Sequence, residues 1–394
     1  MNLPNATIRR LLTFSLLALP LAGCRPHDFP QYAPNDREYA YVTNGGSGTV
    51  SVFDVINVRL DREIAVGQNP ISVAVSPTRN EVYVLNSGAA NGQGSVSVIN
   101  AENNSIASTI AVHRQPVAIE IDPKGDLAYV ANSGANTISV IDLKTRREIA
   151  AIGAGEEPVA LSISPDGKTL AAANRKANSV SLIDPATRKV RAVFEGCPGA
   201  ADAVILPDSS KVFVACSGGH QIMSIALAHG EAHPAQSQAI PAQPDRLEAI
   251  LDVGQAPLQL ALKPDGGELF AMNSLSNSSS EVVTGTNDVL GATILGDTPI
   301  RGLVSINNSL LYVANFRSQY VAVYSIDEGK RLNSIHVGDG PSAMAFSTSG
   351  HLLFVVDSHS NDVAVVRAST RSLFQLLPAG RDPNAIAVKT FKLP

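Results

Sequence analysis

A short motif recurs eight times along this 394-residue chain, and its spacing constrains the fold more than any other feature. Each copy has an aromatic or apolar residue, then Val or Ala, then any residue, then usually Asn. The fourth positions are Asn44, Asn86, Asn132, Asn174, Cys216, Asn273, Asn315 and Asp357, and successive ones differ by 42, 46, 42, 42, 57, 42 and 42 residues. A fixed period near 42 made of short strands is typical of a β-propeller with one four-stranded blade per repeat. The sequence therefore predicts a single all-β propeller of eight blades; the alternative is seven blades with one degenerate unit.

The repeat over residues 155–196 shows how one blade is built. Its segments alternate apolar and polar residues and are rich in β-branched side chains, as strands are. From the inside of the ring outward, the expected strands are Val159–Ser164, Thr169–Asn174, Ser179–Asp184 and Lys189–Phe194. The repeated Asn ends the second strand at a hairpin, where its side chain can bond the backbone. We therefore interpret the Asn ladder as structural.

The two ends of the repeat region complete each other. The first motif has no inner strand before it, whereas the chain ends with an inner strand, Asn384–Thr390, that has no blade after it. We expect this C-terminal strand to join the strands near residues 38–66 and close the ring, which removes open sheet edges. The 57-residue step places extra residues after Ile225, predicted to form a loop between the third and fourth strands of that blade.

Residues 1–23 are predicted to be a signal peptide. Arg9 and Arg10 precede an apolar stretch, Leu11–Leu21, that is too short to span a bilayer of about 30 Å. The stretch ends in Leu-Ala-Gly-Cys24, which resembles the lipobox of bacterial lipoproteins. The resemblance implies cleavage before Cys24 and lipid attachment to its thiol; the alternative is an ordinary secretory peptide.

Lipidation would place the protein in the bacterial cell envelope. Several acyl chains, at about 0.8 kcal/mol per buried CH₂, give a stable membrane anchor. Arg25, rather than Asp, follows the cysteine, and the enterobacterial sorting rule that this resembles favours the periplasmic face of the outer membrane over the inner membrane. Residues 24–37 are rich in proline and are interpreted as a flexible tether ahead of a propeller at 38–394.

The charge of the chain argues against a nucleic-acid partner. Removing the two arginines of the signal peptide from 30 basic residues leaves 28 against 35 acidic ones, a net charge of −7. A protein that neutralises phosphates needs a basic face, and no basic cluster is present in the sequence.

Several recurrent segments together resemble the YVTN-repeat β-propeller family over about residues 38–391. They are Tyr-Val-Thr-Asn at 41–44, Gly-x-x-Pro before most inner strands, Ser-Pro-Asp-Gly-Lys at 164–168, and third strands such as Val-Ser-Val-Ile-Asn at 96–100. The resemblance implies a secreted, cell-surface or periplasmic protein, structurally related to cytochrome d1-type nitrite reductases and more distantly to lactonases and quinoprotein dehydrogenases. Such a fold does not by itself define a function.

Candidate site residues lie first in the loops that lead into the inner strands. Four of the eight blades place carboxylates there: Glu156, Glu157, Asp297, Asp339 and Asp382; Arg114 and Arg381 add positive charge. Convergent oxygen ligands suit a hard cation such as Ca²⁺, or a polar ligand bridged by arginine. The alternative is that exposed turns are simply polar, so the metal and the cofactor stay undetermined.

A second set of candidates lies within the inner strands. Most residues there that we expect to face the channel are Ala or Ser, whereas the exceptions are Glu120, Asp202, Gln259 and Arg301. Charges at such positions are costly unless they are paired or hydrated. Arg301 can therefore pair with Asp202 or Glu120 across the channel, or the charges can line a water-filled ligand site.

Cys197 and Cys216 lie 19 positions apart within one blade. The first replaces the Gly of Gly-x-x-Pro and the second replaces the ladder Asn, so both map to the same face. In an oxidising periplasm they are candidates for a disulfide worth about 3 kcal/mol. A catalytic thiol is disfavoured because no partner histidine is predictable.

The leading functional hypothesis is a monomeric, non-enzymatic module, held at the membrane by its lipid, whose loops bind a protein or polymer partner. The alternative is a periplasmic enzyme, either a lactonase-like hydrolase with a channel cation or a cytochrome d1-like redox protein with a non-covalent cofactor. Covalent c-type haem is excluded by the absence of Cys-x-x-Cys-His. The absence of Trp argues against a quinoprotein dehydrogenase, whose blade motif is built on Trp.

Overall fold

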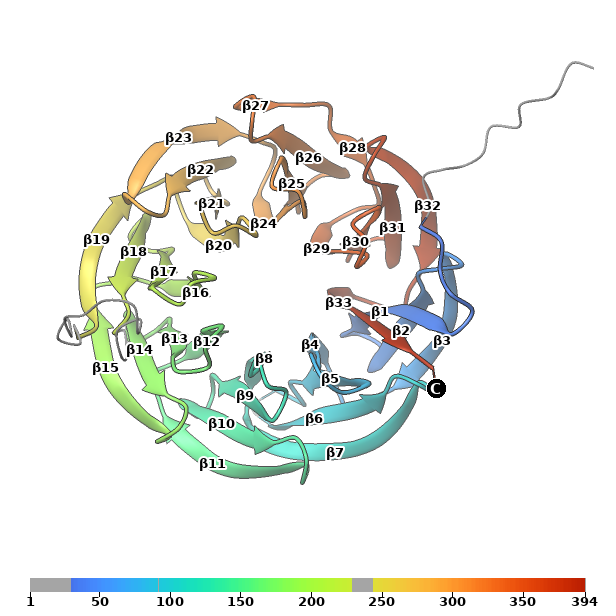
Figure 1. Cartoon of the computed structure of the whole chain (residues 1–394), viewed down its shortest axis with the longest axis horizontal. Coiled ribbons are helices and arrows are strands. Elements are labelled where there is room, and N and C mark those ends of the chain that lie inside the picture. The colour runs from blue at the N-terminus through green and yellow to red at the C-terminus, as the bar shows by residue number, and fades with distance from the viewer. Residues whose placement is uncertain (1–29, 91, 229–243, 394) are drawn as a thin grey trace, which may run out of the picture.

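The computed structural model describes residues 30–90, 92–228 and 244–393, which form a ring of eight antiparallel sheets around a central axis (Figure 1). The eight-bladed all-β propeller predicted from the motif spacing is confirmed. From the innermost strand outward, blade 1 is β33 (Pro383–Lys392), β1 (Asp36–Asn44), β2 (Thr49–Asp54) and β3 (Arg59–Ala65).

The next blades follow in chain order around the ring. Blade 2 is β4 (Pro70–Val75), β5 (Glu81–Asn86), β6 (Gln93–Asn100) and β7 (Ser105–Arg114). Blade 3 is β8 (Pro116–Ile121), β9 (Leu127–Asn132), β10 (Thr137–Asp142) and β11 (Arg147–Gly153). Blade 4 is β12 (Pro158–Ile163), β13 (Leu170–Asn174), β14 (Ser179–Asp184) and β15 (Lys189–Glu195).

Blades 5 to 8 complete the ring. Blade 5 is β16 (Ala200–Ile205), β17 (Lys211–Cys216), β18 (Gln221–Ala226) and β19 (Arg246–Asp252). Blade 6 is β20 (Pro257–Leu262), β21 (Glu268–Asn273), β22 (Ser278–Val283) and β23 (Asp288–Ile294). Blade 7 is β24 (Pro299–Val304), β25 (Leu310–Asn315) and β26 (Tyr320–Ser325), with a split outer edge formed by β27 (Lys330–Arg331) and β28 (Ile335–His336). Blade 8 is β29 (Pro341–Phe346), β30 (Leu352–Asp357), β31 (Asp362–Arg367) and β32 (Ser372–Pro378).

The hydrophobic core lies between blades rather than at the centre of the ring. It divides into clusters that each join two neighbouring blades. In seven of the eight blades the first residue of the motif is among the largest fully buried side chains of this core: Tyr41, Tyr83, Tyr129, Phe213, Phe270, Tyr312 and Phe354. Blade 4 has Ala171 there instead. Burying one such side chain contributes about 2–3 kcal/mol. The motif therefore recurs because every blade must cover its neighbour.

The ring closes between the two ends of the chain. β33 pairs antiparallel with β1, and Tyr41 lies opposite Ala387 in this register. Figure 1 shows this strand, in red, beside the blue strands of blade 1. The predicted closure by the C-terminal strand is therefore confirmed, and no open inner edge is left in blade 1.

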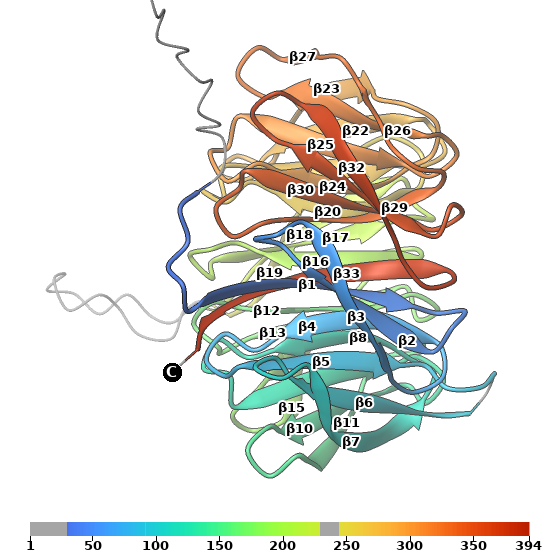
Figure 2. The same ribbon diagram turned by 90° about the vertical axis from the view of Figure 1, so that its right-hand side faces the viewer.

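The loops on the two sides of the ring differ. We call the side with the loops that enter the inner strands, such as 154–157, and the loops between second and third strands, such as 175–178, the rim face. The opposite side carries the turns between first and second strands, such as 164–169, and is called the turn face. The β1 end at Asp36 and the β33 end at Lys392 both lie on the turn face, on the left in Figure 2.

Several predicted segments lie outside the described residues. They are the signal peptide at 1–23, the lipidation site Cys24, the first part of the tether and most of the predicted insertion, 229–243. The insertion is entered from Ala226, where β18 ends, and left at Arg246, where β19 begins, so it does connect a third and a fourth strand.

Within the part of the chain that the structure describes, no helix is long and apolar enough to cross a membrane.

Candidate functional site

The ladder Asn residues are packed structural elements rather than exposed ligands. In blade 4, Asn174 is fully buried, and its Nδ2 donates to Ser179 Oγ at 3.3 Å and Ser181 Oγ at 3.0 Å. The glycine of Gly-x-x-Pro lies directly against this side chain, because a Cβ added to Gly155 would lie 2.8 Å from Asn174 Cγ. Asn174 bonds hydroxyls of the third strand, whereas Asn132 and Asn315 also donate to backbone carbonyls, at 3.3 Å to Val130 and 3.3 Å to Val313. The backbone bonds expected from the sequence are therefore present in some blades, and the role is structural.

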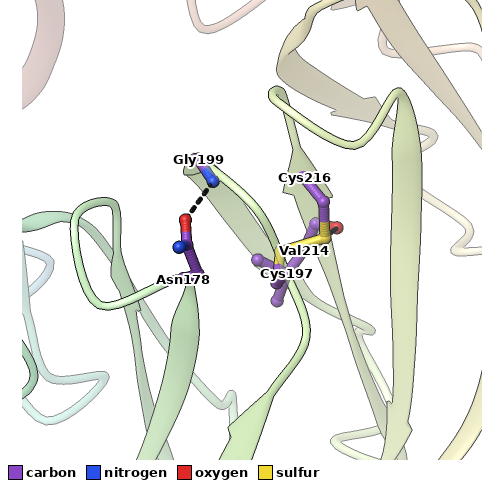
Figure 3. Close-up of a disulfide and its surroundings, with 5 residues drawn as sticks. All are labelled: Asn178, Cys197, Gly199, Val214 and Cys216. Atoms are coloured by element: carbon purple, nitrogen blue, oxygen red, sulfur yellow. Dashed lines mark hydrogen bonds between the residues drawn. A yellow bond between two sulfur atoms is a disulfide. The ribbon is translucent and has the colours of Figure 1, made fainter.

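Blade 5 replaces this Gly–Asn contact by a covalent bond (Figure 3). Cys197 stands at the Gly position, Cys216 at the Asn position, and their sulfurs are joined, with the two Cα atoms 4.8 Å apart. Both residues are fully buried. The neighbouring Asn178 Oδ1 accepts a bond from the Gly199 amide at 2.8 Å. Since the sulfurs are bonded to each other, neither is a free nucleophile or metal ligand.

A second ladder on the rim face was not predicted. The residue just before each inner strand has a left-handed backbone in all eight blades: Asn69 (φ 49°), Gln115 (49°), Glu157 (57°), Gly199 (62°), Ala256 (52°), Thr298 (56°), Gly340 (69°) and Asp382 (54°). In five blades the amide of this residue donates to a side chain four positions beyond the second strand: Asn136, Asn178, His220, Asn277 or Asn361. The sequence contains a signal for this second ladder, because an Asn recurs four residues after the ladder position in several blades.

The predicted rim carboxylates are each held within their own neighbourhood. Glu156 lies 3.1 Å from Lys176, and Glu157 lies 3.4 Å from Arg175. Asp339 Oδ2 lies 3.7 Å from a ring nitrogen of His359.

Asp297 accepts from the Thr298 hydroxyl at 3.0 Å, and Asp382 packs near Gly45. Among the described residues, no three His, Cys, Asp or Glu side chains are grouped to hold a metal ion.

Asp202 and Gln259 link neighbouring inner strands. Asp202 Oδ2 accepts from the Leu260 amide of the next blade at 2.9 Å, and Oδ1 accepts from the Ala203 amide at 3.0 Å. Gln259 Oε1 accepts from the Gly302 amide, again of the next blade, at 2.7 Å. Burial raises the pKa of Asp202, while the Leu260 amide and Arg301 act in the opposite direction. These two side chains therefore hold blades 5, 6 and 7 in register.

Glu120, on β8, lies deep in the ring but is partly exposed to the channel. In the described part of the chain its carboxylate has no hydrogen-bond or ion-pair partner. Burial, and to a smaller extent the charge of Asp202, raise the pKa of Glu120 to about 7. Near neutral pH this carboxyl group therefore exists in both protonation states.

Arg301, on β24 of blade 7, is exposed. Blade 7 stands diametrically opposite blade 3, which carries Glu120 (Figure 1). The guanidinium forms no direct ion pair with Asp202 or Glu120 and no hydrogen bond with any other described side chain. Its charge nevertheless lowers the pKa of Asp202, so the two groups share one electrostatic environment. Among the described residues, the site thus contains the cation of Arg301, the carboxylate of Asp202 with its two amide bonds, and the carboxyl group of Glu120 without a bonded partner.

The ring of eight antiparallel blades, closed by the C-terminal strand, defines this protein as a β-propeller. Residues 125–391 match the YNCE-like β-propeller family, and the chain belongs to that family. Residues 39–152 also match the seven-bladed β-propeller lactonases. No curated protein matches the chain.

Solved structures share the fold at low identity. Hydrazine synthase of Kuenenia stuttgartiensis is 21% identical, with a TM-score of 0.56 over 84% of this chain and 92% of that one. A putative 6-phosphogluconolactonase of Bacteroides uniformis is 14% identical, with a TM-score of 0.60 over 90% and 100%. The dihydro-heme d1 dehydrogenase NirN is 14% identical, with a TM-score of 0.61 over 77% and 66%. At these identities the likeness extends to the fold alone.

Proposed function

We propose that this protein is a non-enzymatic binding module of the bacterial cell envelope. A lipid on Cys24 anchors it, on the periplasmic side and preferentially at the outer membrane, and its rim face binds a protein or polymer partner. The observation that supports this proposal is the attachment of the N-terminal segment to the turn face, opposite the rim.

Three contacts fix this segment. Tyr32 donates to Glu38 Oε2 at 3.1 Å, and the Thr348 amide of blade 8 donates to Glu38 Oε1 at 2.6 Å. The Leu393 amide donates to the Asn35 carbonyl at 2.9 Å. Glu38 is only 2% exposed, so these contacts are part of the folded ring.

The length of the remaining tether then sets the position of the ring. Residues 25–29 separate the lipidation site from the described chain, and an extended chain spans at most about 3.6 Å per residue, or about 20 Å here. A lipid on Cys24 would therefore hold the turn face close to the bilayer and leave the rim face directed away from it.

The rim face carries apolar and aromatic side chains on blades 6 to 8. Leu275 is 71% exposed, Tyr320 46% and Leu258 37%, and the ring of Phe316 packs at 4.8 Å from that of His359. We call these five residues the rim patch. Exposed aromatic and apolar groups beside polar loops are typical of protein interaction sites.

Two comparisons test the proposal. Cys24→Ala should move the protein from the membrane to the soluble periplasmic fraction, and a variant that stays in the membrane contradicts the anchor. A photo-crosslinking residue at Leu275 should give adducts in intact cells, whereas the same residue at Leu290 should not. Leu290 is 61% exposed but lies on the outer strand of the same blade, away from the rim. Equal adducts from both positions would contradict a rim-face partner.

A lactonase-like hydrolase is the second candidate, favoured by the lactonase match over residues 39–152, which includes Glu120. Hydrolysis of sugar lactones by the purified protein, lost in Glu120→Gln, would establish it against the binding module. An absorption spectrum of the same sample tests the redox alternative, because a bound haem or quinone absorbs visible light.

A further inference from the structure

Three successive blades carry a long polar residue at the same position of the inner strand. They are Asp202 in blade 5, Gln259 in blade 6 and Arg301 in blade 7. The first two use a side-chain oxygen to accept an amide bond from the next inner strand, at 2.9 and 2.7 Å. In these two blades the position has a clear structural task, which is to fasten one blade to the next.

Arg301 cannot perform that task. A guanidinium has five N–H donors and no acceptor, so it cannot bind the backbone amide of the following strand. The side chain is exposed and, within the described ranges, has neither a hydrogen bond nor an ion pair. Arg301 therefore makes no bond of this kind between blades, whereas Asp202 and Gln259 each make one.

The two acids of the inner strands do not neutralise Arg301 by contact. Both oxygens of Asp202 already accept backbone amides, at 3.0 and 2.9 Å. Glu120 is partly protonated near neutral pH because its pKa is raised to about 7. The other blades contribute small residues at the matching inner-strand positions: Ser72, Ala118, Ala160, Ala343 and Ala385. Arg301 is therefore the one cationic side chain in a series in which five of the eight positions are short.

The backbone beneath Arg301 is rigidly placed. Gly302 is buried, and a Cβ there would lie 2.9 Å from Met272 Cε and 3.0 Å from Ala261 Cβ. Its amide is the one bonded by Gln259. The strand that carries Arg301 therefore needs little backbone reorganisation to bind a ligand, which favours affinity.

We propose that the guanidinium of Arg301 binds an oxyanion, the carboxylate or phosphate group of a ligand that enters the channel from the rim face. Arginine binds such groups through two parallel N–H···O bonds, which are stronger than neutral hydrogen bonds. The inference rests on the proposed function, since it names the chemical group that this face receives.

The test is calorimetric titration of the purified full-length protein in detergent, with succinate as the carboxylate probe and sulfate as the tetrahedral oxyanion. We expect binding of at least one probe in the millimolar range, and a loss of at least about tenfold in Arg301→Gln. Arg317→Gln is the matched control: this arginine is exposed in a rim loop of the same blade, and its loss should leave the affinity unchanged. The stronger of the two probes identifies the ligand class.

A pH series with sulfate, whose charge is constant from pH 6 to pH 8, adds a second readout. Protonation of Glu120 removes a negative charge from the channel, so affinity should rise as the pH falls through about 7. Asp202 and Arg301 are the other charged groups of this cluster, and Glu120→Gln should flatten the profile while keeping the binding.

Three results would overturn the proposal: no binding of either probe up to about 10 mM, equal affinity in Arg301→Gln and the parent, or equal losses in Arg301→Gln and Arg317→Gln. None of them depends on the lipid or on a partner. Failure here therefore leaves the fractionation and crosslinking tests of the proposed function intact, and the reverse also holds.

Discussion

Blades 5 and 8 solve the same packing problem in different ways. In blade 5 the Gly–Asn contact is replaced by the Cys197–Cys216 disulfide. In blade 8 the glycine is kept, and Asp357 takes the place of the Asn; its Oδ2 accepts the Gly338 amide at 3.0 Å. Both replacements are fully buried. The contact thus tolerates either a covalent bond or an acid.

The two solutions respond to different conditions. The disulfide does not titrate, whereas burial and the neighbouring Asp362 raise the pKa of Asp357 to about 8. The Cys197–Cys216 bond of blade 5 therefore depends on the redox state. The stability of the Gly338–Asp357 contact in blade 8 depends on the protonation of Asp357. Substitutions at the Gly and Asn positions of different blades can therefore distinguish the effect of redox state from the effect of pH.

The largest effect is expected in blade 1, where the same pair is divided between the two ends of the chain. A Cβ on Gly380 would lie 2.7 Å from Asn44 Cγ, so this contact belongs to the ring closure. A chain ending at Leu377 loses β33, and we expect it to aggregate instead of remaining a folded monomer. Size-exclusion chromatography with circular dichroism measures this. A chain lacking only Pro394 is the control, and a soluble, monomeric truncation would contradict the closure.

The disulfide of blade 5 should have the next largest effect. Cys216→Ala is expected to lower the free energy of unfolding by about 3 kcal/mol, from the loss of a cross-link that closes a loop of this size. The double variant Cys197→Gly with Cys216→Asn restores the pair found in other blades and should recover part of this loss. Urea denaturation measures both. Equal stabilities of the parent and Cys216→Ala under oxidising conditions would show that the bond contributes nothing.

In blade 8 we expect Asp357→Asn to remove a pH dependence. Between about pH 4 and pH 8 the folded protein holds a proton on Asp357 that the unfolded chain releases, so stability falls as the pH rises through this range. From pH 6 to pH 9 the loss should be about 3 kcal/mol. The Asn variant carries no such proton and should be the more stable protein at pH 9. Thermal unfolding at the two pH values measures this, and parallel profiles of variant and parent would contradict it.

A regular blade should give the smallest effect. A Cβ on Gly254 would lie 2.5 Å from Asn273 Nδ2, so Gly254→Ala should cost about 1–2 kcal/mol. Gly153 is the control, because a Cβ there meets nothing within 4 Å. Gly153→Ala should stay within about 0.5 kcal/mol of the parent. Equal costs for the two substitutions, from urea denaturation, would mean that the Gly–Asn contact is not what requires glycine.

Much of the fold could be predicted because each copy of the motif independently indicates the same four-stranded blade. The motif period gave the number of blades, and the unmatched inner strand at Asn384–Thr390 gave the closure. The common position of Cys197 and Cys216 relative to Gly and Asn also pointed to the pair that the structure joins.

The candidate site was less accessible to sequence reasoning. Alternation shows that Glu120, Asp202 and Arg301 lie on inner strands, but it does not show how far each side chain reaches. Asp202 bonds the backbone of the next blade, and Arg301 has no direct partner among the residues that the structure describes. The left-handed residues before the inner strands were missed because only Gly199 and Gly340 of the eight are glycines.

The closing strand also has a consequence for the rate of folding. β1 appears near the start of the chain, yet its inner neighbour β33 is the last strand to be made. Contacts between residues so distant in sequence carry a high loop-closure entropy and form slowly. Blades 2 to 8 each consist of strands that are consecutive in sequence, whereas blade 1 is complete only when β33 pairs with β1. The slowest folding phase of this protein should therefore be the formation of blade 1.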